Sequence, residues 1–168
     1  MGTLLVNQRE GLVDMARDAN ATHVLWIDSD MIVPPDSAQR LLSHRVDVVA
    51  GNYVTRQYPH KTVAYSKFND WNSYVTHDSA SMDTLTRVDA VGMGCILMRM
   101  SVFDRLTKPY FQTQWVPETN DHMGEDFTLC SKLKMIGCEV LIDNDLSRSL
   151  QHLGTFAFTH GMVRPSQG

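Results

Sequence analysis

Two aspartates spaced one residue apart, Asp28 and Asp30, directly follow the apolar run 24–27. The run is typical of a short, fully buried strand, and an unpaired carboxylate is too costly to follow it into the core. We therefore expect both acids where the strand leaves the sheet, at the place where open α/β sheets bind ligands. Carboxylates that share a crevice need a cation between them, and their oxygens suit Mg²⁺ or Mn²⁺ on a phosphate. The pair predicts a metal–phosphate site, although a turn with a helix cap has the same composition.

Two further acids, Glu125 and Asp126, follow Gly124 at the start of a predicted helix. A carboxylate there could take the proton from an incoming hydroxyl, or hold that hydroxyl. The alternative is complementation of the helix dipole, which is worth roughly 0.3–1 kcal/mol. Because neighbouring helical residues point about 100° apart, we expect one acid to face a cleft and the other a structural partner.

A late histidine, His152, follows a predicted strand and could complete a metal shell as a neutral imidazole. A lone histidine is more often an ordinary surface or core residue. Two glycines, Gly92 and Gly94, flank Met93 and could let the backbone pass close to a sugar. A simple turn between strands explains these glycines equally well.

Two arginines, Arg9 and Arg56, are candidates for contacts with a phosphate or nucleotide, because the guanidinium group binds phosphate through two parallel hydrogen bonds. Both could equally be surface charges. His122 could belong to a lid over the site, whereas His23 and His44 lie at the edges of predicted elements and suggest no chemistry.

The elements that must position these residues alternate between helices and strands. Helices are expected over 6–19, from 36 through 42, over 102–106 with Ser101 as its cap, and over 125–136; strands are expected over 23–27, 46–50, 85–90, 95–98 and 140–142. The order strand–helix–strand over 23–50 predicts direct parallel pairing through a right-handed crossover.

Two segments are rich in aromatic and polar residues. The segment 53–82 contains Tyr53, Tyr58, Tyr65, Phe68, Trp71 and Tyr74, and the segment 107–123 contains Tyr110, Phe111 and Trp115. We expect strands and loops that cover a cleft in the first segment, and a polar loop in the second. Aromatic faces there could stack on a sugar, or form an interface with a partner protein.

The bulk composition is that of an ordinary globular domain, with 168 residues, 43% hydrophobic and 20% charged. A net charge of −4 disfavours nucleic-acid binding, and the sequence has neither a signal peptide nor an apolar run long enough to span a membrane. Three cysteines without a CxxC pair indicate reduced core thiols. A cytoplasmic location is therefore expected.

Taken together, the motifs resemble those of GT-A-fold nucleotide-sugar glycosyltransferases, in particular the family 2-like group with its small phage and bacterial members. The similar stretches are HVLWIDSDMIVPP (23–35), VDAVGMGCILMRMSVFDRL (88–106), HMGEDFTLCSKLKMIG (122–137) and QHLG (151–154). The resemblance spans roughly residues 7–155.

The resemblance implies an α/β fold, a single GT-A-like (Rossmann-like) domain over 1–168 with a mostly parallel central sheet and a shortened N-terminus. Its nucleotide and metal half would cover about 1–100 and its acceptor half about 101–160. A small phage-type enzyme of this kind would work in the host cytoplasm.

The resemblance also implies roles for individual residues. Asp30 and His152 would bind Mn²⁺ or Mg²⁺, and Asp28 would contact the donor ribose or a water on the metal. Asp126 would be the base of an inverting reaction, with Glu125 beside it on the acceptor side. Arg9, Gly92 and Gly94 would line the donor site.

The expected function is metal-dependent transfer of a sugar from a nucleoside diphosphate sugar, most simply a UDP-sugar, to a hydroxyl acceptor. Two alternatives stay open: a nucleotide- or carbohydrate-binding module without turnover, and a metal-dependent phosphoryl-transfer enzyme. The net charge of −4 disfavours the second alternative. A homo-oligomer is compatible with the sequence.

Overall fold

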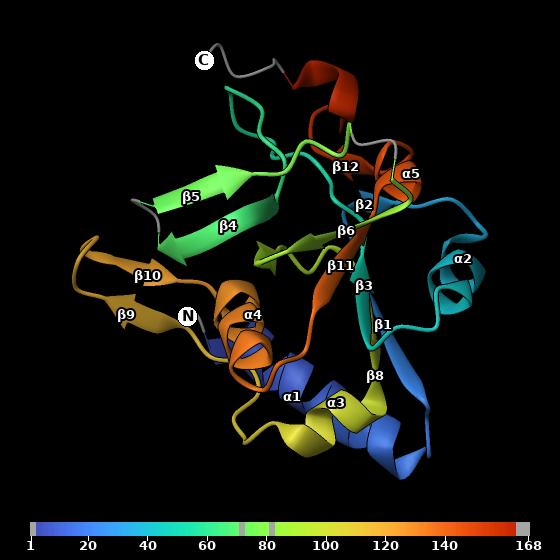
Figure 1. Cartoon of the computed structure of the whole chain (residues 1–168), viewed down its shortest axis with the longest axis vertical. Helices are drawn as coiled ribbons and strands as arrows, with labels where there is room; N and C mark the ends of the chain where they lie inside the picture. Colours follow the sequence, from blue (N-terminus) through green and yellow to red (C-terminus); the bar gives the residue numbers. More distant parts are fainter. Residues whose placement is uncertain (1–2, 71–72, 81–82, 164–168) are drawn as a thin grey trace.

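A five-stranded sheet forms the centre of the computed structural model of the chain, which describes residues 3–70, 73–80 and 83–163 (Figure 1). The strands lie in the order β1 (His23–Ile27), β8 (Cys95–Arg99), β3 (Val48–Ala50), β11 (Val140–Asp143) and β6 (Leu85–Val88). The pair β3–β11 is parallel, whereas the pairs β1–β8, β8–β3 and β11–β6 are antiparallel. The α/β class is confirmed, but the expected mostly parallel sheet is wrong, because the sheet is mixed.

The strand β8 lies between β1 and β3 and pairs with both. The predicted direct parallel pairing of the first two strands is therefore wrong. β1 is an edge strand in which Trp26 is buried while Ile27 is 43% exposed, so the expectation of a fully buried strand is wrong as well. An edge strand needs apolar residues only where it meets its one neighbour and the helices beneath it.

Helices cover both faces of the sheet (Figure 1). One face packs on α1 (Thr3–Asp18), α3 (Met100–Arg105) and α4 (Glu125–Met135), and the other on α2 (Ser37–Ser43) and α5 (Asn144–Ser147). Successive residues of β3 alternate between the two cores, as strand geometry requires: Val48 and Ala50 join the first cluster and Val49 the second. The predicted helix 102–106 begins earlier, since Ser101 lies inside α3 and Arg99 is its N-cap.

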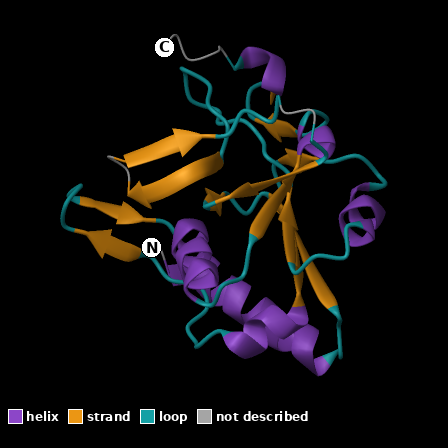
Figure 2. Ribbon diagram, in the orientation of Figure 1, coloured by secondary structure: helices purple, strands orange, loops and turns teal. Residues whose placement is uncertain are grey.

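Three small antiparallel sheets surround the main one (Figure 2). They are β5 (Ser73–Thr76), β4 (Ala64–Asp70) and β7 (Ala90–Val91); β13 (Ala157–Phe158), β12 (Gln151–Leu153) and β2 (Met31–Ile32); and the hairpin of β9 (Gln114–Val116) and β10 (Asp121–Met123). A short 3-10 helix, η1 (His160–Met162), follows β13. The second of these sheets matters most for the site, because it joins the end of the chain to the segment after β1.

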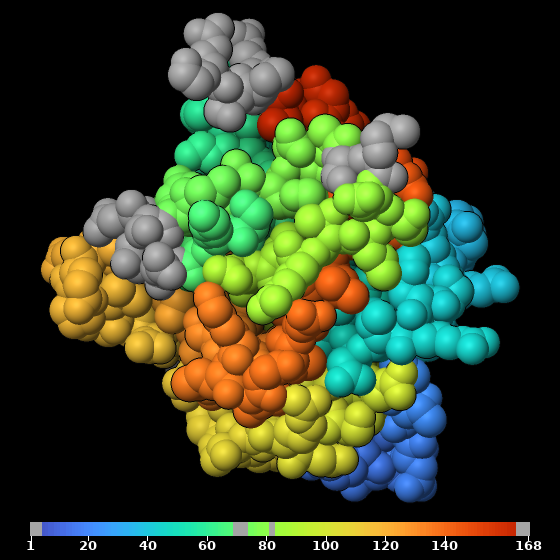
Figure 3. All heavy atoms as spheres, viewed as in Figure 1, coloured from blue at the N-terminus to red at the C-terminus, as the bar shows by residue number. Residues whose placement is uncertain are grey.

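Both aromatic segments contribute to the core, contrary to expectation. Tyr53 and Tyr65 from the first segment and Phe111 from the second are buried. The second segment is also not a plain loop, because it contains the β9–β10 hairpin, which projects from the body of the molecule (Figure 3). Aromatic residues spread among polar ones marked strands that bury one side, rather than a lid. Trp71 lies outside the described residues.

The three cysteines are free and buried, which confirms the interpretation as core thiols. Within the described residues, no helix is long and apolar enough to cross a membrane.

Candidate functional site

The pairing of β2 with β12 brings the aspartate pair next to the late histidine. His152 lies opposite Met31 in this ladder, and the Leu153 amide donates to the Asp30 carbonyl at 2.7 Å. As a result, the Nε2 atom of His152 lies 3.3 Å from Oδ2 of Asp30. Two residues separated by 121 others in the sequence thus meet at one end of the structure.

The second ring nitrogen fixes the chemistry of this pair. His152 Nδ1 lies 2.9 Å from the Val54 carbonyl, which can only accept, so Nδ1 must carry the proton of a neutral ring. Nε2 is then an acceptor, and it faces a carboxylate oxygen of Asp30 that is also an acceptor. Two acceptors at this distance need a proton or a metal ion between them. A histidine whose other nitrogen donates to a backbone carbonyl is the usual arrangement of a metal ligand.

Arg56 completes this end of the site. Its Nη1 lies 3.0 Å from Asp30 Oδ2 and donates to the Leu153 carbonyl at 3.2 Å. The side chain is 47% exposed and can therefore reach a ligand from solvent. Among the described residues no group of three His, Cys, Asp or Glu side chains could hold a metal ion, so the protein offers an ion here two ligands, Asp30 and His152.

Arg9 lies under the aspartate turn rather than on the surface. Its side chain is 6% exposed; Nη1 lies 2.8 Å from Oε1 of Glu125, and Nη2 lies 3.5 Å from Oδ1 of Asp28. Nη1 also donates to the sulfur of Met93 at 3.0 Å. The guanidinium thus joins α1 to the start of α4 and to the end of β1, and its donors are already used by the protein.

The sequence signal for this role lies on α1 itself. Val6 and Val13 pack against the core, and Arg9 stands three residues after the first and four before the second, so it falls on the same buried face. A lone charge within an apolar helical stripe needs a buried partner. Here two partners come from distant parts of the chain.

Glu125 and Asp126 do point to different neighbours, as expected for adjacent helical residues. Glu125 turns to Arg9, while Oδ1 of Asp126 accepts from the Phe127 amide at 2.8 Å. Burial, and next the charge of Glu125, raise the pKa of Asp126 to about 6. Burial also raises the pKa of Asp28, and the nearby Arg9 guanidinium opposes that rise.

Tyr53 is a site residue that the sequence analysis did not identify. It is buried, its hydroxyl accepts from the Gly94 amide at 3.2 Å, and its ring meets the ring of His152 edge-on at 5.2 Å. Burial, and next the charge of Asp126, raise its pKa. A weak signal existed, because Tyr53 follows a predicted strand, at the sheet end where ligands gather.

The two glycines make room for this tyrosine. A Cβ atom on Gly92 would lie 2.6 Å from the Tyr53 hydroxyl oxygen, and one on Gly94 would lie 2.6 Å from Tyr53 Cζ. The space beside the glycines is therefore filled by an aromatic ring and is not open to a sugar. Their smaller size serves packing at this position.

The other histidines lie apart from this cluster. His122 on β10 is exposed and stacks edge-on with Trp115 at 5.0 Å. His44 lies 2.8 Å from the buried carboxylate of Asp143. His23 contacts the neighbouring Thr22 hydroxyl. None of these three contacts involves the residues around Asp30.

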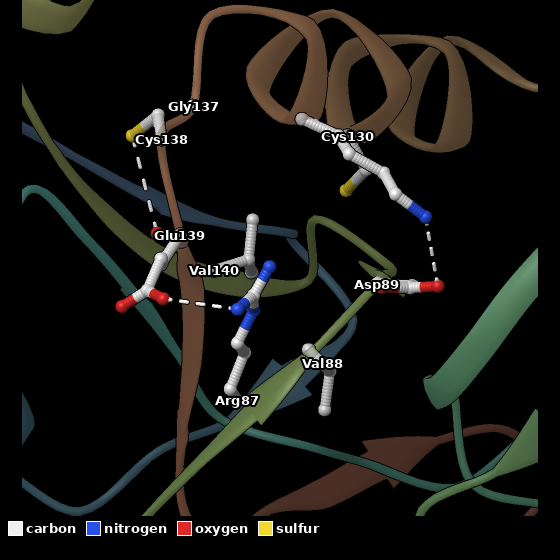
Figure 4. Close-up of a pocket in the computed structure, with 9 residues that line it drawn as sticks. Arg87, Val88, Asp89, Cys130, Gly137, Cys138, Glu139 and Val140 are labelled. Carbon is white, nitrogen blue, oxygen red and sulfur yellow. Dashed lines mark hydrogen bonds and ion pairs between the residues drawn. The ribbon is translucent and has the colours of Figure 1, made fainter.

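A separate small cavity of about 100 Å³ lies between α4, β6 and β11 (Figure 4). Two ion pairs border it, Arg87 with Glu139 and Lys134 with Asp89. The residues that line it include none of the acids or arginines of the predicted site. It is too small for a nucleotide sugar, since ligand pockets usually measure about 300–1,000 Å³.

No family model and no curated protein sequence matches the chain. Among solved structures, the chain is similar to A197 from STIV, a viral protein with a GT-A-like fold, with a TM-score of 0.58 and 19% sequence identity over 89% of this chain and 68% of that one. At this identity the likeness shows the fold alone. The expected membership of the family 2-like group is wrong: the sequence matches no family model, and the structural neighbour is this viral protein.

Proposed function

We propose that this protein is a metal-dependent transferase that moves a sugar from a nucleoside diphosphate donor, with a UDP-sugar as the first candidate, to a hydroxyl acceptor. The main support is the pair of facing acceptors, Nε2 of His152 and Oδ2 of Asp30 at 3.3 Å. A second support is Asp126, whose pKa of about 6 suits a base near neutral pH. The GT-A-like fold is compatible with this chemistry but does not by itself imply it.

The donor set fits Mn²⁺ or Mg²⁺. Imidazole nitrogen together with carboxylate oxygen suits Mn²⁺, and Mg²⁺ commonly takes one or two carboxylates together with phosphate oxygens. With Asp30 and His152 as the protein ligands, the remaining positions would belong to the diphosphate and water. When bound, the metal ion would stabilise the negative charge that develops on the departing diphosphate.

The chain's own residues would orient and deprotonate the reactants. Arg56, half-exposed beside Asp30, would turn toward the diphosphate. The Asp126 carboxylate would take the proton of the acceptor hydroxyl, whose oxygen forms a bond to the anomeric carbon. The bond from that carbon to the diphosphate breaks, and its electron pair leaves with the diphosphate. Glu125 would act indirectly, by holding Arg9 and keeping the pKa of Asp126 high.

The first experiment is a thermal-shift screen of UDP, GDP and CDP and their sugars, each with and without Mn²⁺. A ligand at 100 times its dissociation constant stabilises a fold by about 2.7 kcal/mol, which such a screen detects. We expect a shift that requires both Mn²⁺ and one nucleotide. It should disappear in Asp30→Ala and persist in Asp36→Ala, where an exposed acid with no side-chain capping bond is removed from the same region.

Turnover is tested separately with the nucleotide so identified. Asp126→Asn should keep Mn²⁺-dependent nucleotide binding and lose sugar transfer. Normal transfer by this variant would exclude Asp126 as the base. Binding by the wild-type chain without any consumption of a sugar donor would favour a binding module, and the absence of any shift would refute the donor site.

A further inference from the structure

A second cavity, of about 790 Å³, lies near the C-terminal end of the described chain. Its walls come from the loop 58–62, strand β5, the segment 78–80 and η1, which gather at one end of the molecule in Figure 1. Its volume is within the usual range of about 300–1,000 Å³ for small-molecule sites. Asp28, Asp30 and Asp126 are not among the residues that line it.

The charges that line this cavity are mostly positive, although the chain as a whole carries −4. Lys61 and Arg148 contribute cations, and Asp78 is the acid that lines the same space. Lys61 Nζ lies 3.3 Å from the Tyr74 hydroxyl and, in the part of the chain that the structure describes, pairs with no carboxylate. Arg148 is partly neutralised by Asp145. The cavity therefore favours a ligand with a negative group.

An imidazole in the wall adds a requirement of a different kind. Both ring nitrogens of His160 are buried, and neither has a hydrogen-bond partner among the described residues. Burial, and next the charge of Arg148, lower the pKa of His160, so the ring is neutral at pH 7. A neutral imidazole has one donor and one acceptor to satisfy. Sugar hydroxyls can serve both, whereas a carboxylate or phosphate dianion can only accept.

Aromatic rings complete the lining and extend toward the Asp30 site. Tyr58, which is 76% exposed, and Tyr74 offer amphipathic faces to a ligand. The ring of Tyr58 lies 6.0 Å from that of His60, which lies 5.1 Å from that of Phe158. A Cβ atom on Gly154 would lie 2.5 Å from Phe158 and 3.3 Å from Arg56, so this row of rings ends beside the arginine that pairs with Asp30.

Backbone contacts connect the cavity to the same site. Thr62, in the cavity wall, forms a bridge with Val54, whose carbonyl accepts from His152. His160 follows β13, which pairs with the strand that contains His152. A molecule in the cavity would thus be held by the same two segments that hold the proposed metal ligand.

We propose that this cavity binds an acidic saccharide, that is, a sugar ring with a carboxylate or phosphate group. Resting on the proposed function, we further infer that this saccharide is the acceptor of the transfer reaction. Lys61 would bind the anionic group, His160 the hydroxyls, and Tyr58 the apolar face of the ring.

The test is an NMR titration of the full chain with sodium glucuronate, glucose 6-phosphate and glucose, following backbone amides of residues 58–62 and 74–80. We expect both acidic sugars to shift these amides and glucose to bind at least about tenfold more weakly, because charge-assisted hydrogen bonds are the stronger ones. Lys61→Met should weaken the acidic sugars at least about tenfold. Lys67→Met, which removes an exposed lysine of β4 outside the cavity, should leave their affinity unchanged.

The outcomes separate this inference from the proposed function. Asp30→Ala should abolish Mn²⁺-dependent nucleotide binding and leave glucuronate binding intact, and Lys61→Met should do the reverse. Glucose binding as tightly as glucuronate, equal affinity in Lys61→Met, or shifts confined to residues around Asp30 would each overturn the cavity assignment. Binding at the cavity without any transfer to the bound sugar would overturn its role as acceptor.

Discussion

Replacing Arg9 by methionine removes one charge from the centre of the site while keeping most of the side-chain volume. Arg9 faces Glu125 at 2.8 Å and Asp28 at 3.5 Å, and its own side chain is 6% exposed. Methionine can fill the same space beside Met93 without introducing a new polar group. The substitution therefore isolates the guanidinium charge from the packing of the α1 side chain.

The expected loss of stability follows from how buried each pair is. The side chain of Glu125 is 16% exposed, so its pair with Arg9 is a buried one, and removing one partner of a buried pair costs about 3–5 kcal/mol. Asp28 is 42% exposed and contributes only about 0.2–1 kcal/mol. We expect Arg9→Met to lower the free energy of unfolding by about 3–4 kcal/mol, near the lower end because Glu125 keeps some contact with solvent.

A double-mutant cycle with Glu125→Gln tests the cause of this loss. Glu125→Gln leaves Arg9 with Asp28 and should cost less than Arg9→Met. The double variant removes both charges of the buried pair, so its loss should be smaller than the sum of the two single losses by about 1.5–3 kcal/mol. Urea unfolding of the four proteins at pH 7, with matching m-values, measures the coupling.

Two results would refute this reasoning. A loss below about 1 kcal/mol in Arg9→Met would mean that the pair behaves like a surface salt bridge. Additivity within about 0.5 kcal/mol would mean that Arg9 and Glu125 do not act on each other. In either case, the connection between α1, α4 and the aspartate turn would not depend on this charge.

The remaining predictions concern pH and packing. Because the reaction needs the Asp126 carboxylate, the pH profile of kcat/KM should fall as the pH drops through about 6, and Glu125→Gln should move this limb to lower pH; an unmoved limb would contradict the electrostatic cause. Asp143→Asn should cost about 3–5 kcal/mol in urea unfolding, since it breaks a buried ion pair. Burial raises the pKa of Asp143, but its hydrogen bonds outweigh this and lower the pKa, so its contribution is present above the ordinary value of 3.8 and lost as the pH falls below it; a variant equally destabilised at pH 3 would contradict this. Gly94→Ala should cost about 1–3 kcal/mol by collision with Tyr53, and Tyr53→Ala should relieve part of the added cost; two costs that simply add would exclude the collision.

Much of the local structure could be predicted from the sequence, since it depends on local patterns. The helix at 125 follows from Gly124, two acids and an apolar stripe, and it is α4 in the structure. Gly137 ends it with a φ of 68°, the left-handed conformation that glycine favours. The strand order could not be predicted, because short apolar strands look alike whichever neighbour they pair with.

The site shows the same division. Asp30 and His152 were expected to converge because both follow strands, and the structure brings them together. Tyr53 was missed because its burial depends on two glycines far along the chain. Arg9 was considered only as a surface charge or a phosphate contact, because its partners are set by tertiary packing rather than by its own segment.

The order of strands in the main sheet has a consequence for how the chain folds. The neighbours β1 and β8 are separated by 67 intervening residues, from 28 through 94, and the parallel neighbours β3 and β11 by 89, from 51 through 139. No hairpin nucleates this sheet, so every ladder must close a long loop, which slows folding. During synthesis β6 stays without its partner in the sheet until β11 emerges, and β11 then joins β6 to β3 in one step. A chain that stops before residue 140 would therefore expose two unpaired strand edges and be prone to aggregate.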